Sequence, residues 1–335
     1  MAELKELTLA QRFSMIALNA QRSNMMTTVK KISLRVMAAA VILEVNLEGG
    51  LTAANGKIEN APVPGRNASS GDLAYREAIL KPVGSKVRGR QLQLPWWLKQ
   101  ASSLPKRTMD PFELVMAKSL SDLGMMEEIP NLLGCDMYYE SAGVTIKEYR
   151  CPIQEYTRIT EGFRAEILEE GPISDDAVCL LWLLRESGCL PDLFSRNELD
   201  LVATRMNELD LSDPLAHTIF PIRIYRGWEF GVKNALRMKK SFVRTTVGTG
   251  MLFLFPLLDR SQAVFIETEA WFSNSKQRLE AVKERLEVQG HVFTVLKDGE
   301  IPMIKIDNLV YEAVPHFVTV RVPIQGVRLL PKRPI

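Results

Sequence analysis

The sequence predicts a mainly α-helical protein, in which a helix bundle is wrapped by amphipathic helices and carries a β-hairpin. A small C-terminal α+β module follows. Two observations support this fold class. Residues 171–209 have the pattern of two capped amphipathic helices joined by a turn, and such helices bury one face against other helices. After about residue 250 the apolar residues recur with the period of short strands around one helix. We therefore expect a helical domain over residues 1–245 and the α+β module over residues 250–335.

The helix pair at 171–209 carries its own start and stop signals. Ser174 is expected to cap the first helix, and Gly188 is expected to end it. Ser195 and Glu198 match the S-x-x-E capping box of the second helix. The apolar face of that second helix consists of Leu199, Val202, Met206 and Leu209. The two helices are therefore expected to pack against other helices of the bundle.

Five helices are expected before the hairpin. Thr8 and Gln11 form a capping box at the start of the first. The second spans about residues 28–47, and its middle, VMAAAVILEV, is apolar on every side, so it should be the most buried helix. The other three are expected over residues 72–80, 96–101 and 111–123. Pro111 suits the first turn of the last one, because its missing N–H would have no partner there.

A change of period predicts the hairpin and the C-terminal strands. The hairpin arms are expected at 132–139 and 144–149, around a turn at 140–143. Helical patterning then continues from about Tyr156 to about Phe242. In the C-terminal module, Ser273 or Ser275 is expected to cap a helix that ends near residue 289. The strands of this module are expected over residues 263–267, 291–296, 303–306 and 317–322.

Composition limits the cellular context. The net charge is only +2, so the whole molecule is not an obvious nucleic-acid binder. The four cysteines show no C-x-x-C spacing, which favours reduced thiols in a cytosolic protein. The N-terminal sequence has no apolar targeting core, and no apolar run approaches the roughly 20 residues that cross a bilayer. We expect a cytoplasmic protein that touches membranes only peripherally.

No constellation of catalytic residues is recognisable. The three histidines, His217, His291 and His316, lack the spacing of a zinc site. The adjacent carboxylates, such as Asp175 and Asp176, are better explained by helix caps, because sequence neighbours do not face each other on a helix. We therefore expect a non-enzymatic protein with no metal site and no cofactor. The alternative is an enzyme whose site is assembled from scattered residues.

Several motifs in a fixed order resemble the Golgi phosphoprotein 3-like family over about residues 4–240. They are Leu7-Thr8-Leu9, the run ILEVNLEGGL at 42–51, Ser70-Gly71-Asp72, Trp97, Asp110-Pro111-Phe112, Leu123-Gly124-Met125 and the Leu-rich helix at 175–187. None of these motifs is specific alone. The resemblance implies a cytosolic adaptor that docks on anionic membranes, binds phosphatidylinositol 4-phosphate and gathers client proteins.

The chain departs from the residues with which that family binds its phosphoinositide. Family members use a Trp and an Arg around the start of the second helix, and an Arg-x-x-Arg pair before the hairpin. The matching positions here hold Val29, Ala38, Asp110 and Glu113. Carboxylates repel a phosphate head group, whereas charge-assisted donors bind it. Tight, head-group-specific recognition is therefore not expected.

Two basic segments remain as candidate contacts with an anionic lipid surface. One lies at 81–99, where cations lead into Trp96 and Trp97, and the other at 221–244, where a packed helix with a solvated basic face is the favoured interpretation. Lys30 and two further cations of the second helix could rebuild part of the family's site. A solvated helix edge is the favoured alternative for them. Weak lipid binding is predicted through Lys31, Arg35, Lys86, Arg88, Arg90 and Trp96.

Two kinds of protein partner are also expected. The resemblance raises the expectation of a homo-oligomer formed through the hairpin at 132–149. The alternative is a hairpin that folds back on its own bundle. A client protein is the second kind of partner, and nucleic acid is not expected. The competing function is a soluble protein–protein interaction scaffold, in which the C-terminal module binds the partner.

Overall fold

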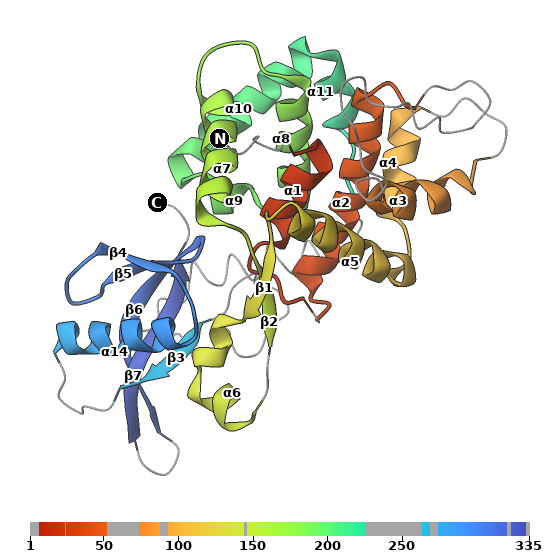
Figure 1. Cartoon of the computed structure of the whole chain (residues 1–335). Helices are drawn as coiled ribbons and strands as arrows, with labels where there is room; N and C mark the ends of the chain where they lie inside the picture. The colour runs from red at the N-terminus through yellow and green to blue at the C-terminus, as the bar shows by residue number, and fades with distance from the viewer. Residues whose placement is uncertain are drawn as a thin grey trace, which may run out of the picture. The chain divides into compact units, whose positions relative to one another are not determined.

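The computed structural model describes residues 7–23, 25–51, 74–87, 93–143, 146–224, 263–268, 274–319 and 323–332. Its contacts divide the chain into two compact units (Figure 1). The helical unit consists of Met1–Leu18, Thr28–Met126 and Gln154–Arg237. The sheet unit consists of Asn19–Thr27, Glu127–Ile153 and Met238–Ile335. Two segments from the N-terminal half, including the hairpin, thus belong to the sheet unit.

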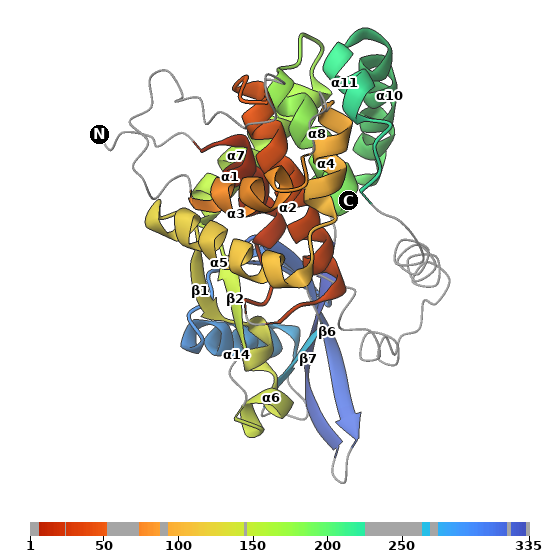
Figure 2. The ribbon, with the colours of Figure 1, turned by 90° about the vertical axis from the view of Figure 1, so that its right-hand side faces the viewer.

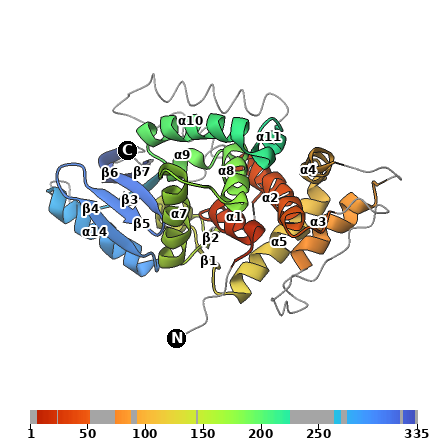
Figure 3. The same ribbon diagram turned by 90° about the horizontal axis from the view of Figure 1, so that it is seen from above.

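The helical unit is organised around α2, which spans Thr28–Leu47. The side chains from Val36 to Leu43 are all fully buried, as the apolar run in the sequence predicts. Figure 3 shows other helices on several sides of α2. The other helices of this unit are α1 (Leu9–Leu18), α3 (Ala74–Gly84), α4 (Leu94–Ser102), α5 (Lys106–Asp122), α7 (Ile153–Leu168), α8 (Asp175–Ser187), α9 (Leu190–Leu193), α10 (Arg196–Ser212) and α11 (Pro214–Ile219). The mainly helical fold class is therefore confirmed.

The predicted helix caps are present. The side chain of Ser174 accepts a hydrogen bond from the N–H of Ala177, and Gly188 ends α8 in the left-handed region at φ 72°. Ser195 and Glu198 make both hydrogen bonds of the capping box at the start of α10. These features depend on neighbouring residues alone, which is why the sequence predicts them correctly.

The prediction for α5 was wrong about its start. The helix begins at Lys106, after an extended Pro105, so Pro111 lies inside the helix and not in its first turn. The reason is burial, because Met109 already belongs to the buried face that continues through Phe112. The third helix also extends further than predicted, past Pro82 to Gly84.

The prediction for the first hairpin arm was also wrong. Strand β1 spans Glu127–Pro130 and pairs antiparallel with β2, which spans Lys147–Arg150. The residues predicted as the first arm form a 3-10 helix, η1 (Leu132–Cys135), and then α6 (Met137–Ser141). The side chain of Asn131 caps η1, and Leu132, Leu133 and Cys135 are all buried in the sheet-unit core. Burial of adjacent residues is incompatible with the alternating faces of a half-exposed strand.

The sheet unit contains a five-stranded antiparallel sheet in the order β3-β7-β6-β5-β4. Its strands are β3 (Val264–Glu267), β4 (Phe293–Lys297), β5 (Met303–Ile306), β6 (Leu309–Thr319) and β7 (Pro323–Lys332). Helix α14 (Ser275–Val288) packs Leu279, Val282 and Leu286 into the same core as the buried side chains of the sheet. Figure 1 shows α14 running across the strands.

Two predictions for this module need correction. The strand predicted at 317–322 corresponds only to the end of the longer strand β6, which pairs antiparallel with β7 (Figure 2). Residues 320–322 lie outside the described residues. Asn274, not Ser275, caps α14, because its side chain accepts a hydrogen bond from the N–H of Gln277. Ser273 lies outside the described residues. The strands predicted at 263–267, 291–296 and 303–306 are present within one or two residues at each end.

Two findings bear on the predicted context. All four cysteines are buried, and none of them forms a disulfide. Among the described helices, none combines the length and the apolar character that a bilayer crossing requires.

Candidate functional site

The residues predicted to bind lipid lie in or next to three helices of the helical unit. Lys31 is exposed in the first turn of α2, and Arg35 is half-buried one turn later. Lys86 is exposed just after the end of α3, and Trp96 is half-buried in α4. Arg88 and Arg90 lie outside the described residues.

The structure brings Lys86 and Trp96 onto one surface. The Nζ of Lys86 donates a hydrogen bond to the Oε1 of Gln100 over 3.4 Å. Gln100 follows Trp96 by one helical turn on α4, so the two side chains share a helix face. Trp97 packs inward, with 6 % of its surface exposed, and its ring meets that of Trp96 edge-on at 5.1 Å between centroids. Trp97 therefore anchors α4 and leaves Trp96 at the surface.

The positive charge continues along the chain beyond the basic segment predicted at 81–99. Residues 81–107 contain seven lysines and arginines and no aspartate or glutamate: Lys81, Lys86, Arg88, Arg90, Lys99, Lys106 and Arg107. Lys99, Lys106 and Arg107 are exposed. The last two were missed because α5 was predicted to begin after Asp110, whereas they form its first turn. We give the name basic–tryptophan face to Trp96 and the exposed cations of this stretch of sequence, which are Lys86, Lys99, Lys106 and Arg107.

Lys30 does not contribute to a surface site. Its side chain is 1 % exposed and forms an ion pair with the buried carboxylate of Glu113. Val29 and Ala38 are also buried. Of the four positions that correspond to phosphoinositide ligands in the resemblance, only Asp110 is substantially accessible, and it lies 4.0 Å from the Nζ of Lys106. The matching positions therefore form no pocket for a phosphate.

The hairpin residues predicted to mediate self-association pack within the sheet unit. Tyr139 in α6 and Ile146 next to β2 lie against the core formed by the sheet and α14. Glu140 of α6 also forms an ion pair with Arg285 of α14. A homo-oligomer through residues 132–149 stays a prediction.

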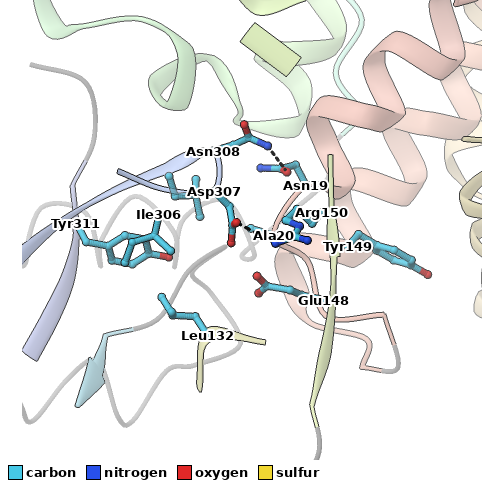
Figure 4. A pocket seen from close by; sticks show the side chains of 11 residues that line it. Asn19, Ala20, Leu132, Glu148, Tyr149, Arg150, Ile306, Asp307, Asn308 and Tyr311 are labelled. Atoms are coloured by element: carbon cyan, nitrogen blue, oxygen red, sulfur yellow. Dashed lines mark hydrogen bonds and ion pairs between the residues drawn. The ribbon is translucent and has the colours of Figure 1, made fainter. Parts of the chain in front are cut away.

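A second candidate region is a polar junction in the sheet unit, where three distant segments meet (Figure 4). The first segment runs beside β2, because Ala20 N–H donates to the carbonyl of Tyr149 at 2.8 Å and Tyr149 N–H donates to Gln21 at 2.9 Å. The second segment is β2 itself. The third is the two-residue turn between β5 and β6, where the Nδ2 of Asn308 donates to the Oδ1 of Asn19 at 3.1 Å. The junction is thus built by side chains from 19–21, β2 and 307–308.

The backbone of this junction is unusual in two places. Ala20 has φ 60° and Asp307 has φ 51°, and they are the two non-glycine residues in the described ranges with positive φ. Both line the same small recess. Such backbone conformations persist where surrounding contacts enforce them. The recess holds roughly one water molecule, so it is no substrate pocket.

Two carboxylates share the recess. Burial, followed by the nearby charge of Asp307, raises the pKa of Glu148 to about 8. Arg22, Arg150 and the hydrogen bond from Asn131 act in the opposite direction but do not outweigh burial. Glu148 therefore retains its proton at neutral pH in most molecules.

No local sequence pattern marks this junction. Its members come from segments more than 100 residues apart, and each residue alone fits a turn or a strand. His291, predicted to be structural, is buried and hydrogen-bonded through Nδ1 to Asp307 at 2.8 Å. Within the described residues, no group of three or more histidine, cysteine, aspartate or glutamate side chains is placed to hold a metal ion.

No protein-family model and no curated protein matches the chain. The side chains of the basic–tryptophan face and of the polar junction are therefore the basis for functional inference.

Proposed function

We propose that this protein is a non-enzymatic peripheral membrane adaptor that binds anionic lipid surfaces weakly through its basic–tryptophan face. The observation that carries the proposal is the charge of residues 81–107, with seven cations and no anion, beside the half-buried Trp96. A tryptophan next to cations suits the boundary between lipid head groups and acyl chains, because the indole has both an apolar body and a polar N–H.

The expected binding is additive and salt-sensitive. Each cation close to an anionic membrane contributes about 1 kcal/mol, so several must act together. Exposed charges are screened over about 10 Å at 0.1 M salt. Head-group specificity is not proposed, because these cations are surface charges and the positions that would form a phosphate pocket, Val29, Ala38 and Glu113, are buried. Arg88 and Arg90 belong to the same stretch of sequence and are part of the proposal.

The direct test is flotation of the full chain with vesicles of neutral lipid, of anionic phosphatidylserine and of phosphatidylinositol 4-phosphate, at low and high salt. We expect binding to both anionic vesicles at low salt, loss at high salt and none to neutral vesicles. The test variant replaces Lys86, Lys99, Lys106 and Arg107 by glutamine. We expect it to bind at least about tenfold more weakly. A Trp96→Ala variant should weaken binding by a smaller factor.

A matched control removes four exposed cations elsewhere: Arg196, Lys147, Lys276 and Lys297, each replaced by glutamine. Net charge falls equally, so an effect of overall charge would weaken both variants alike. Equal weakening, or the absence of binding under every condition, would contradict the proposal. Tight binding to phosphatidylinositol 4-phosphate alone would show a specific site in its place.

A soluble interaction scaffold is the second candidate, favoured by one observation on the sheet unit. β4 lies at the edge of the five-stranded sheet, and an edge strand can pair with an extended segment of another protein. Val292, Leu296 and Ile301, in and near this strand, are 52 %, 51 % and 47 % exposed. A protein that ignores all vesicles but captures an extended peptide along β4, with loss on Leu296→Lys, would favour this function.

A further inference from the structure

The two carboxylates of the polar junction have unequal partners. Asp307 accepts three hydrogen bonds, from Arg150 Nη1 at 3.2 Å, His291 Nδ1 at 2.8 Å and Val292 N–H at 3.2 Å. Glu148 is 9 % exposed and accepts one hydrogen bond, at 2.5 Å, from the Nδ2 of Asn131. The guanidinium of Arg150 therefore donates to Asp307, whereas the hydrogen bond that the buried Glu148 accepts comes from a neutral amide.

The orientation of the Asn131 amide is fixed by a second contact. Its Oδ1 accepts a hydrogen bond from the N–H of Leu133 at 2.9 Å, so Nδ2 must face Glu148. A single neutral donor offsets little of the cost of burying a carboxylate charge. The geometry thus favours the neutral acid at Glu148, while Asp307 accepts from a guanidinium. A buried carboxyl group that lies beside a second carboxylate is suited to respond to pH.

The charged groups that act on Glu148 are Arg22 from the segment beside β2, Arg150 from β2 and Asp307 from the β5–β6 turn. Glu127 of β1 pairs with Arg150, and Asp136 after η1 and Arg285 of α14 act on the neighbouring Cys135. His291 reaches the pair through Asp307. Burial raises the pKa of the nearby Cys135 thiol to about 12, so it stays neutral.

We propose that the Glu148–Asp307 junction is a proton-operated latch, which holds residues 19–21, β2 and the 307–308 turn together while Glu148 is protonated and loosens when it ionises. Ionisation places a second buried negative charge beside Asp307. The least costly way to solvate this charge is for water to enter where the three segments meet. The segment released in this way is the connection between α1 and α2.

The direction of the pH effect follows from proton linkage. The pKa of Glu148 is raised from 4.5 in the open, solvated state to about 8 in the closed junction. Protonation therefore stabilises the closed state fully below about pH 4.5, and this stabilisation is lost as pH rises toward 8. Within that window the equilibrium constant for opening should rise by about tenfold per pH unit.

Hydrogen exchange of the full chain between pH 5 and 8 tests the latch. Peptides covering residues 19–23, 147–151 and 305–309 report on its three segments, and α8 serves as an internal reference. In the unaltered protein we expect protection factors of the three segments to fall by about tenfold per pH unit. In Glu148→Gln, which mimics the neutral acid, they should stay flat. The exposed Glu267→Gln should behave as the unaltered protein does.

The same slope in Glu148→Gln and in the unaltered protein would overturn the proposal. A second measurement keeps it falsifiable if the glutamine variant does not fold. In the unaltered protein, a carbon-13 titration of the Glu148 carboxyl should have its midpoint near pH 8. A midpoint below pH 6 would also overturn the latch.

Discussion

The two units bury charge in different ways. In the helical unit, Lys30 and Glu113 form a buried ion pair, and Arg76 reaches two carboxylates, those of Glu44 and Glu48. In the sheet unit, the buried Glu148 accepts a hydrogen bond from a neutral amide, while a guanidinium donates to Asp307. Paired charges are insensitive to pH near neutrality, whereas an unpaired buried acid is not. This protein thus uses buried charge both in fixed ion pairs and at a titratable group.

Secondary structure explains part of this difference. Glu44 lies in the last turn of α2 and Glu48 follows directly after its end, with its N–H bonded to the carbonyl of Glu44, so both carboxylates face the same guanidinium of α3. Glu44 also accepts a hydrogen bond from the hydroxyl of Tyr75 at 2.7 Å. A strand sends alternate side chains to the same face, so β2 presents both Glu148 and Arg150 to the junction. The guanidinium of Arg150 donates to Asp307 and Glu127, so the hydrogen bond that Glu148 accepts comes from another segment, through Asn131.

The largest expected effect concerns the buried ion pair between Lys30 and Glu113. Lys30→Met removes the cation of this buried ion pair with Glu113 and should lower the free energy of unfolding by about 3–5 kcal/mol. The double variant Lys30→Met/Glu113→Leu should recover most of this loss, because it removes both charges. Denaturant unfolding measures each change. Lys99→Met, at an exposed position, is the control and should change stability by less than about 0.5 kcal/mol. If Lys30→Met cost no more than the control, the buried pair would contribute nothing.

How much of the molecule the sequence predicts follows from the range of the interactions. The apolar run of α2, the caps Ser174 and Ser195 and the stop at Gly188 depend on residues within a few positions, and each was predicted correctly. The Lys30–Glu113 pair joins two helices, and no local pattern marks it.

The two candidate sites also differ in whether the sequence predicts them. Lys86 and Trp96 of the basic–tryptophan face were predicted because charge and aromatic residues cluster along the chain there. The polar junction was not predicted, because Ala20, Glu148 and Asp307 meet only after the sheet unit has folded. The error in the hairpin has a related cause. Leu132 and Leu133 are both buried by packing on the sheet core, a tertiary contact that overrides their strand-like sequence.

The next effect concerns packing in the sheet unit. At Gly326 in β7, an added Cβ would lie 2.3 Å from the carbonyl oxygen of Ile266 and 2.6 Å from the ring of Phe265. Gly326→Ala should therefore destabilise the sheet unit by about 1–3 kcal/mol through overpacking. Gly134→Ala is the matched control, since its added Cβ would come no closer than 3.8 Å to Gln289. Hydrogen exchange of β3 and β7 measures both, and equal exchange in the two variants would argue against the close approach.

The smallest effect uses a device that both units share. α10 and α14 each begin with a capping box, formed by Ser195 with Glu198 in one and by Asn274 with Gln277 in the other. Ser195→Ala and Asn274→Ala should each cost about 1 kcal/mol at neutral pH. Exchange of the amides in the first turn of each helix should then accelerate by roughly fivefold.

Acid should weaken one of the two caps and leave the other unchanged. The backbone N–H of Ser195, followed by its side chain and by Arg164, lowers the pKa of Glu198 below its usual 4.5, whereas Gln277 does not titrate. A lowered pKa means that the contribution of Glu198 is present above pH 4.5 and is lost as pH falls through the lowered value. The exchange rate in the first turn of α10 should therefore rise in acid after correction for intrinsic exchange, and that of α14 should not. A parallel response of both helices would mean that the carboxylate of Glu198 adds nothing to its cap.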